Sequence, residues 1–191
     1  MGTKFSTRIW VSVVGIASIF LGSKGYADTV ISVADFGLKP DTRENAVAYV
    51  QKAIEACRGK EPVTLVFPEG RYDFWPQYAH EKNYYETNTY DVFPKRLAML
   101  FEGLHNITVD GNGSQFIMHD RIQPITVENC DGVTLKNFSI DWDIPLTAQA
   151  RVTKVGSDFF EIEINVLESP YIIEDGKLVF VGEGWKSALG S

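Results

Sequence analysis

The sequence has few cysteines and lacks the short motifs that mark common cofactor and metal sites. Two cysteines among 191 residues cannot build a disulfide framework, so we expect Cys57 and Cys130 to be small buried side chains rather than a bridge. No P-loop, dinucleotide fingerprint, zinc-ligand spacing or nucleophile elbow is present. The sequence therefore predicts no cofactor and no bound metal ion.

Basic residues are also scarce, and no stretch gathers them into a stripe. The chain has 25 Asp and Glu against 18 Lys and Arg, a formal net charge of −7. Three bases, Lys4, Arg8 and Lys24, precede the first acid, Asp28, so the chain after residue 27 carries a net charge of −10. This acidity argues against nucleic acids and anionic membrane surfaces as partners.

A long apolar run occurs near the N-terminus, at residues 9–21, after Lys4 and Arg8 and before small residues at 25 and 27. These thirteen residues are too few to span a bilayer as a helix, which needs about 20. The pattern is typical of a secretory signal peptide over residues 1–27, cleaved after Ala27, with an uncleaved anchor as the alternative. We expect an exported protein, periplasmic or secreted.

The segment that follows contains extended and helical patterns. Asp41 and Glu44 have capping-box spacing, and an apolar stripe of helical period predicts a helix over about 41–58. Residues 75–98 have no clean period and are rich in tyrosine. This long loop either covers the end of the core or offers rings on which sugars stack. Strands are expected at 30–36, 63–67 and 71–74.

An internal repeat is the most informative feature of the sequence. Residues 99–109 and 125–135 align at an offset of 26, and each copy contains a strand, a polar turn and a second strand. A further strand at 114–118 has its counterpart at 140–142. Apolar residues match at 99/125, 101/127, 104/130, 107/133 and 109/135.

A repeat that buries only one face needs a stacked neighbour, and this one predicts a parallel β-helix. Ile107 should lie over Val133, and Val109 over Leu135, all facing the core. The helix at 41–58 would cap one end of this solenoid.

The pattern changes after Trp142. Residues 148–155 and 159–166 alternate like a hairpin, and 177–181 predicts another strand. We therefore assign the cap and the first coils to 28–145 and the start of an inserted antiparallel β module to 146–191. No second solenoid cap is recognisable, so the chain is expected to be the front part of a longer protein.

Carboxylates are the remaining candidates for chemistry. Asp141 and Asp143 flank Trp142 at a strand end, where residues i and i+2 share a face. Paired acids beside an aromatic ring suit glycoside hydrolysis, but these two are too close for the roughly 6.5–9.5 Å separation of an inverting pair. The alternative is that one caps a turn and the other is solvated. Residues 119–121, His-Asp-Arg, are expected to form a solvated turn.

Several segments carry a resemblance to known families. Residues 33–37, the capped helix and residues 67–72 together resemble the N-terminal entry of pectin-lyase-like β-helices. A narrower set resembles the bacterial α-1,3-galactosidases of glycoside hydrolase family 110, and Gly182-Glu183-Gly184-Trp185 also looks like that family. The narrower set comprises FPEGRYDF at 67–74, YYETN at 84–88, ITVDGNGSQF at 107–116 and LKNFSIDW at 135–142.

The resemblance implies an all-β fold, a right-handed parallel β-helix with an N-terminal capping helix and inserted β-barrel modules. It implies an exo-glycosidase that removes terminal α-1,3-linked galactose from glycans such as blood-group-B-type structures, with inversion and without a metal. The catalytic aspartates of the family lie in later coils, so none is expected before residue 191 and this piece alone should be inactive. Tyr84, Tyr85 and Asp141 carry over as candidates for substrate binding.

Two alternatives remain open at this point: a non-catalytic carbohydrate-binding β-helix and a polysaccharide lyase. A lyase would need calcium and a basic groove, and the net charge of −10 and the lack of an Asp-rich calcium site weigh against it. The expected partner is a glycan with a terminal α-galactose, and the sequence makes no prediction of oligomeric state.

Overall fold

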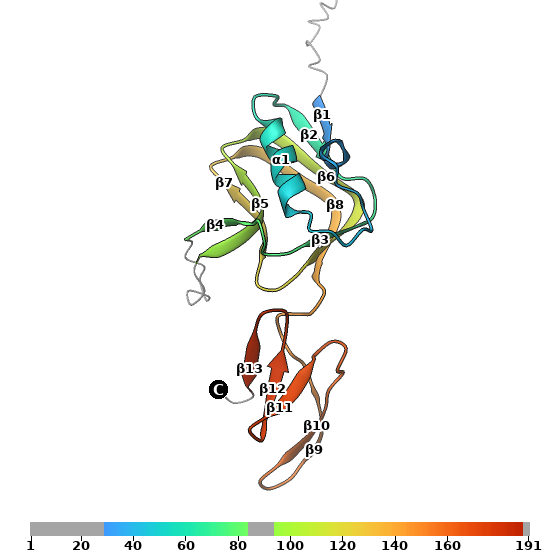
Figure 1. The fold of residues 1–191 in the computed structure, drawn as a ribbon, viewed down its shortest axis with the longest axis vertical. Coiled ribbons are helices and arrows are strands. Elements are labelled where there is room, and N and C mark those ends of the chain that lie inside the picture. Colours follow the sequence, from blue (N-terminus) through green and yellow to red (C-terminus); the bar gives the residue numbers. More distant parts are fainter. Residues whose placement is uncertain (1–28, 84–93, 189–191) are drawn as a thin grey trace, which may run out of the picture.

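The computed structural model describes residues 29–83 and 94–188, which are mostly β-strand with one α-helix (Figure 1). The first part, residues 29–143, holds the helix and parallel strands, and we call it the parallel part. Residues 148–188 form a second set of strands, which we call the C-terminal part. The strands of the parallel part are β1 (Thr29–Ser32), β2 (Val63–Val66), β3 (Arg71–Phe74), β4 (His80–Lys82), β5 (Lys95–Glu102), β6 (His105–Met118), β7 (Gln123–Glu128) and β8 (Asp131–Trp142).

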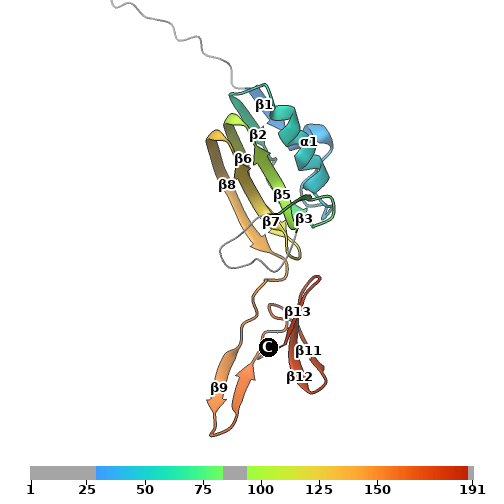
Figure 2. The same cartoon turned by 90° about the vertical axis from the view of Figure 1, so that its left-hand side faces the viewer.

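The long strand β6 is the centre of a parallel sheet (Figure 2). β2 pairs with the first half of β6 and β3 with the second half, while β8 pairs along the other edge. β1 extends the sheet beyond β2. A second, smaller sheet contains β5 between β4, which is antiparallel to it, and β7, which is parallel to it.

The predicted repeat is confirmed in its register. Ile107 pairs with Val133 and Val109 with Leu135, both in parallel strands. In the second sheet Met99 pairs with Ile125 at the same offset. Left-handed residues also recur 26 positions apart, at Gly103 and Asn129 in the β5–β6 and β7–β8 turns and at Asn106 and Gly132 near the starts of β6 and β8. Asn and Gly are the residues that adopt this conformation most readily, so they alternate at these two positions.

The expected offset does not continue through the second half of the strands. Phe116 pairs with Ile140 and Met118 with Trp142, an offset of 24 instead of 26. The register shifts between Asp110 and Ser114. Asn112 and Gly113 take left-handed conformations in this bulge, which places extra residues in β6 that β8 does not have.

The helix starts later than the sequence predicts. Helix α1 covers Val47–Cys57, and the Asn45 side chain accepts a hydrogen bond from the Val47 amide at 3.1 Å. The expected cap, Asp41, has a left-handed backbone, and its carboxylate accepts from the Arg71 amide instead. The capping box proposed for Asp41 and Glu44 is therefore wrong, because Asp41 closes a turn against β3.

The extended run expected at 30–36 also divides. β1 ends at Ser32, and a 3₁₀ turn over Val33–Phe36 follows, capped by the Ser32 and Asp35 side chains. Helix α1 packs its buried stripe, including Val50, Ile54 and Cys57, onto the apolar core that the strands line. Burial raises the pKa of the Cys57 thiol to about 11. Cys57 and Cys130 are both free, and Cys57 is buried as expected, whereas Cys130 is only half-buried.

The C-terminal part is antiparallel, as the alternation predicts. β9 (Arg151–Val155) and β10 (Phe160–Glu163) form a hairpin. β12 (Lys177–Val181) lies between β11 (Tyr171–Glu174) and β13 (Lys186–Ala188). Within the residues described, no helix is long and apolar enough to cross a membrane.

Candidate functional site

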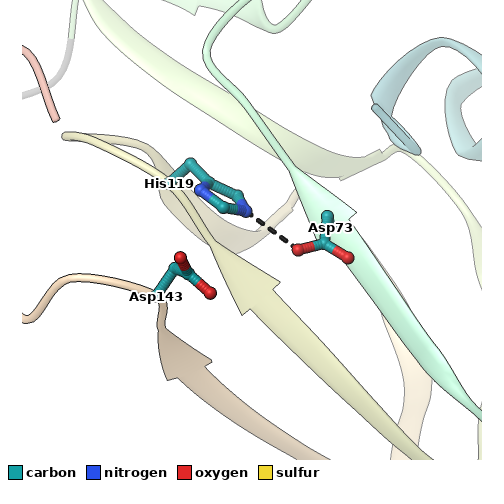
Figure 3. A group of neighbouring side chains, drawn as sticks. All are labelled: Asp73, His119 and Asp143. Atoms are coloured by element: carbon teal, nitrogen blue, oxygen red, sulfur yellow. Dashed lines mark hydrogen bonds and ion pairs between the residues drawn. The ribbon is translucent and has the colours of Figure 1, made fainter. Parts of the chain in front are cut away.

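A cluster of charged side chains lies where the strands β3, β6 and β8 end (Figure 3). Asp73 belongs to the end of β3, and His119 and Asp143 directly follow β6 and β8. The parallel pairing brings these three positions together, because the His119 amide donates to the Phe74 carbonyl and the Asp143 amide donates to the Met118 carbonyl. One oxygen or nitrogen from each of the three side chains lies within 4.8 Å of the others.

Asp73 is the most enclosed charge of the cluster, with a side chain that is fully buried. Arg71 lies on the same strand two residues earlier and donates to Asp73 through Nε at 3.0 Å and Nη2 at 2.5 Å. Burial acts to raise the pKa of the Asp73 carboxyl, but hydrogen bonds from Arg71 and His119 outweigh it and leave that pKa below its ordinary value. The Asp73 carboxylate is therefore held by the Arg71 guanidinium and the His119 ring.

His119 is 3% exposed and contacts a carboxylate through each ring nitrogen. Its Nε2 lies 2.9 Å from Asp73 Oδ1, and its Nδ1 lies 2.8 Å from Glu183 Oε1. A neutral imidazole has one N–H and one bare nitrogen, and a bare nitrogen facing a carboxylate oxygen would be repelled. Both contacts are hydrogen bonds only if His119 carries both protons. The Trp75 ring stacks on the imidazole with centroids 3.8 Å apart.

The third carboxylate, Asp143, is bound by arginine. Arg71 Nη2 donates to Asp143 Oδ1 at 2.7 Å, and Arg43 Nη1 lies 3.7 Å from the same oxygen. The Arg71 guanidinium thus bridges Asp73 and Asp143. A metal ion bound by these oxygens would have to displace that guanidinium, so the donor set does not fit a metal.

The same arrangement does not suit acid–base chemistry. Asp73 and Asp143 lie closer together than the roughly 6.5–9.5 Å that admits a water molecule in an inverting glycosidase. The Arg71 guanidinium also donates to both carboxylates, so these oxygens are already bound to a donor and neither is placed to give a proton to a substrate. The geometry suits a structural connection, because Glu183 comes from the turn between β12 and β13 while its partners come from the parallel part.

The residues predicted from sequence to bind substrate do not enter this cluster. Tyr84 and Tyr85 lie outside the described residues. Asp141 lies in β8 with an exposed side chain, and its Oδ1 accepts from the Trp142 amide at 2.8 Å. Asp141 and Asp143 are therefore not an acid pair: the first caps a local amide and the second pairs with arginine.

The prediction of a solvated turn at 119–121 is wrong for His119. Sequence reasoning also missed Arg71, Asp73 and Glu183. All three lie far from His119 along the chain. Two weak signals were present: Arg71 and Asp73 stand two apart on a predicted strand, and Glu183 lies in the Gly182–Trp185 segment that resembles family 110.

A second charged group joins the smaller sheet. Glu102 and Glu128 pair in register on β5 and β7, which places like charges opposite each other. Lys82 Nζ lies 2.6 Å from Glu102 and 2.8 Å from Glu128 and offsets that repulsion. The pKa of the Lys82 amine is raised, first by its bond to Glu102 and then by its bond to Glu128. This group stabilises the stacking of β5 on β7.

Comparison with known proteins gives a consistent set of relatives. The family model described as GLAA-B beta-barrel domain I matches residues 148–191. Over 163 residues the chain is 63% identical to alpha-1,3-galactosidase B of Bacteroides thetaiotaomicron, and the aligned region covers 85% of this chain and 26% of that protein. It is 36% identical to alpha-1,3-galactosidase A of Shewanella woodyi (83% of this chain, 26% of that protein) and to alpha-1,3-galactosidase B of Phocaeicola vulgatus (94% and 29%). The chain thus spans about a quarter of the length of these relatives.

Proposed function

We propose that this chain is the first part of an enzyme that removes terminal α-1,3-linked galactose from glycans. The reason is that the chain is homologous to bacterial α-1,3-galactosidases and matches their N-terminal quarter. The observation that carries this proposal is the 63% identity over 85% of the chain. The matches at 36% identity to relatives of the same name support it. Blood-group-B-type glycans are the substrates that the sequence resemblance implies.

We propose further that the parallel part is the beginning of a right-handed parallel β-helix. The strands β2, β6 and β8 lie in parallel layers with residues aligned from layer to layer, for example Leu65, Val109 and Leu135. Leu65 and Val109 are buried, whereas Leu135 is 38% exposed and Ile140 of the same strand 37%. An apolar strand with an open edge promotes aggregation. The exposed apolar residues of β8 therefore support the proposal that a further coil covers this strand.

The C-terminal part fits the start of an inserted β-barrel module at 146–191. The family match over 148–191 and the antiparallel strands β9 to β13 support this assignment. The division at residue 145 follows the loss of parallel pairing after Trp142.

The catalytic acids would then lie outside these 191 residues, as in the resembling family, in an inverting and metal-independent site. The charge cluster around His119 supports this placement, since its carboxylates are bound by arginine and histidine. Tyr84, Tyr85 and Asp141 remain candidates for glycan binding. Export with cleavage after Ala27 is proposed from the leader pattern at 1–27.

The test is galactose release from a Galα1-3Gal substrate by the natural gene product and by the 191-residue chain. We expect release by the gene product, no release by the chain alone, and no release from α-1,4- or α-1,6-linked galactosides. NMR of the first product should show β-galactose, because inversion changes the anomer. No release by the gene product would contradict the proposed activity, and turnover by the chain alone would contradict the placement of the acids.

A further inference from the structure

The C-terminal part meets the parallel part where the Gly182–Gly184 turn contacts residues 119–121. Glu183 Oε2 accepts from the Asp120 amide at 3.1 Å, in addition to the contacts of its carboxylate with His119. Arg121 Nη2 donates to the Gly184 carbonyl at 3.4 Å. The connecting residues 143–150 contain no helix or strand. In Figure 1 the strands β9 to β13 lie beyond the end of the parallel sheets, reached from β8 by this connection.

The junction is closely packed as well as charged. A Cβ atom on Gly184, which has a φ of +87°, would lie 2.5 Å from Asp120 Oδ2. Only glycine allows this approach and this backbone conformation together. The Gly182–Gly184 turn therefore places the Glu183 carboxylate at Nδ1 of His119, while Arg71 holds Asp73 at Nε2.

We propose that His119 is an imidazolium bridge that fixes the C-terminal part on the parallel part through Asp73 and Glu183. The charged groups around the imidazole are Asp73 and Arg71 from β3, Asp120 and Arg121 beside it, Asp143 after β8, and Glu183 from the β12–β13 turn. Asp73 is buried and bound by Arg71, so it anchors the imidazolium on the parallel part. Glu183 then binds the second N–H, which makes the position of the β12–β13 turn depend on a charge-assisted hydrogen bond rather than on packing alone.

This role is a positioning role, separate from the glycosidase proposal. It holds for whatever activity the protein has, because it concerns how two β units are oriented.

The test is hydrogen exchange followed by mass spectrometry on the natural gene product, with four variants. Glu183→Ala removes the acceptor, and Glu183→Gln keeps its size and an oxygen but loses the charge. Glu174→Gln is the matched control, because Glu174 pairs with Lys186 inside the C-terminal part and does not cross the junction. His119→Gln removes the bridge from the other side.

We expect the Asp120 amide to exchange roughly ten-fold faster or more in Glu183→Ala and His119→Gln, and nearly as fast in Glu183→Gln. Protease cleavage within 143–150 should accelerate in the same three variants and not in Glu174→Gln. Wild-type exchange and cleavage in Glu183→Gln would overturn the ionic bridge, since an amide oxygen would then suffice. Unchanged exchange in Glu183→Ala would overturn the junction itself.

Discussion

The parallel part and the C-terminal part differ most in where their apolar side chains lie. In β5 and β6 large residues such as Leu97, Phe101 and Phe116 are fully buried. In β9 and β11 every residue is exposed, and Phe160 of β10 is 56% exposed. The parallel part thus buries a core of its own, whereas among the described residues of the C-terminal part the buried apolar side chains are Val179 and Phe180. Hydrogen-bonded strands do not by themselves make a stable unit.

The largest effect should come from matched phenylalanine truncations in the two parts. Phe116 contacts the rings of Phe67, Phe74 and Phe138, with centroids 4.7, 5.7 and 4.8 Å away. Phe116→Ala should lower the free energy of unfolding by about 4 kcal/mol, and Phe160→Ala by less than about 1 kcal/mol. Urea unfolding of the chain 28–191, followed by tryptophan fluorescence, measures both. Equal losses would remove the distinction between the two parts.

The next largest effect concerns the buried charge of the parallel part. Asp73→Ala removes the buried acceptor that Arg71 and His119 share and leaves them only Asp143 and Glu183, which should cost about 3 kcal/mol of unfolding free energy. Glu163→Ala is the control in the C-terminal part, where the exposed pair with Arg151 should contribute less than about 1 kcal/mol. The same urea unfolding curves report both variants. Similar losses in the two variants would contradict a buried ion network.

The acid dependence of stability sharpens the same comparison. Because the pKa of Asp73 is lower in the folded chain, its stabilisation is complete above the unfolded value of about 3.9 and is lost as the pH falls through the folded pKa. The difference in unfolding free energy between wild type and Asp73→Asn should therefore shrink as the pH is lowered from 7 to 2. A constant difference over that range would contradict an ionised Asp73.

The smallest effect compares two glycines with left-handed backbones. A Cβ on Gly132, the second residue of β8, would lie 2.6 Å from Oδ1 of Asn106 in the neighbouring strand β6, whereas one on Gly176, between β11 and β12, would meet nothing within 4 Å. Gly176→Ala should cost about 1 kcal/mol for the backbone alone, and Gly132→Ala about 2 kcal/mol or more. Thermal unfolding measures the order, and the reverse order would contradict the close approach of Gly132 to Asn106.

The strands and their stacking could be predicted from sequence because the information is local and repeated. Matched apolar positions 26 residues apart predict the pairing of Ile107 with Val133, and the alternation after Trp142 predicts the β9–β10 hairpin. The slip to an offset of 24 could not be predicted, because it depends on a bulge at Asn112-Gly113 in one strand. The start of α1 was misplaced because Asp41 has a distant partner, the Arg71 amide, that competes with capping.

The charge cluster was beyond sequence reasoning for a similar reason. His119 has its two partners 46 residues before and 64 residues after it, and no spacing rule connects them. A polar triplet such as residues 119–121 is usually solvated, and here the C-terminal part covers it.

The most direct test of the difference between the two parts is hydrogen exchange on the chain 28–191. The account predicts that amides of β6 exchange at least about 100-fold more slowly than those of the β9–β10 hairpin, because opening β6 requires unfolding the buried core. Comparable protection in β6 and in β9–β10 would contradict it.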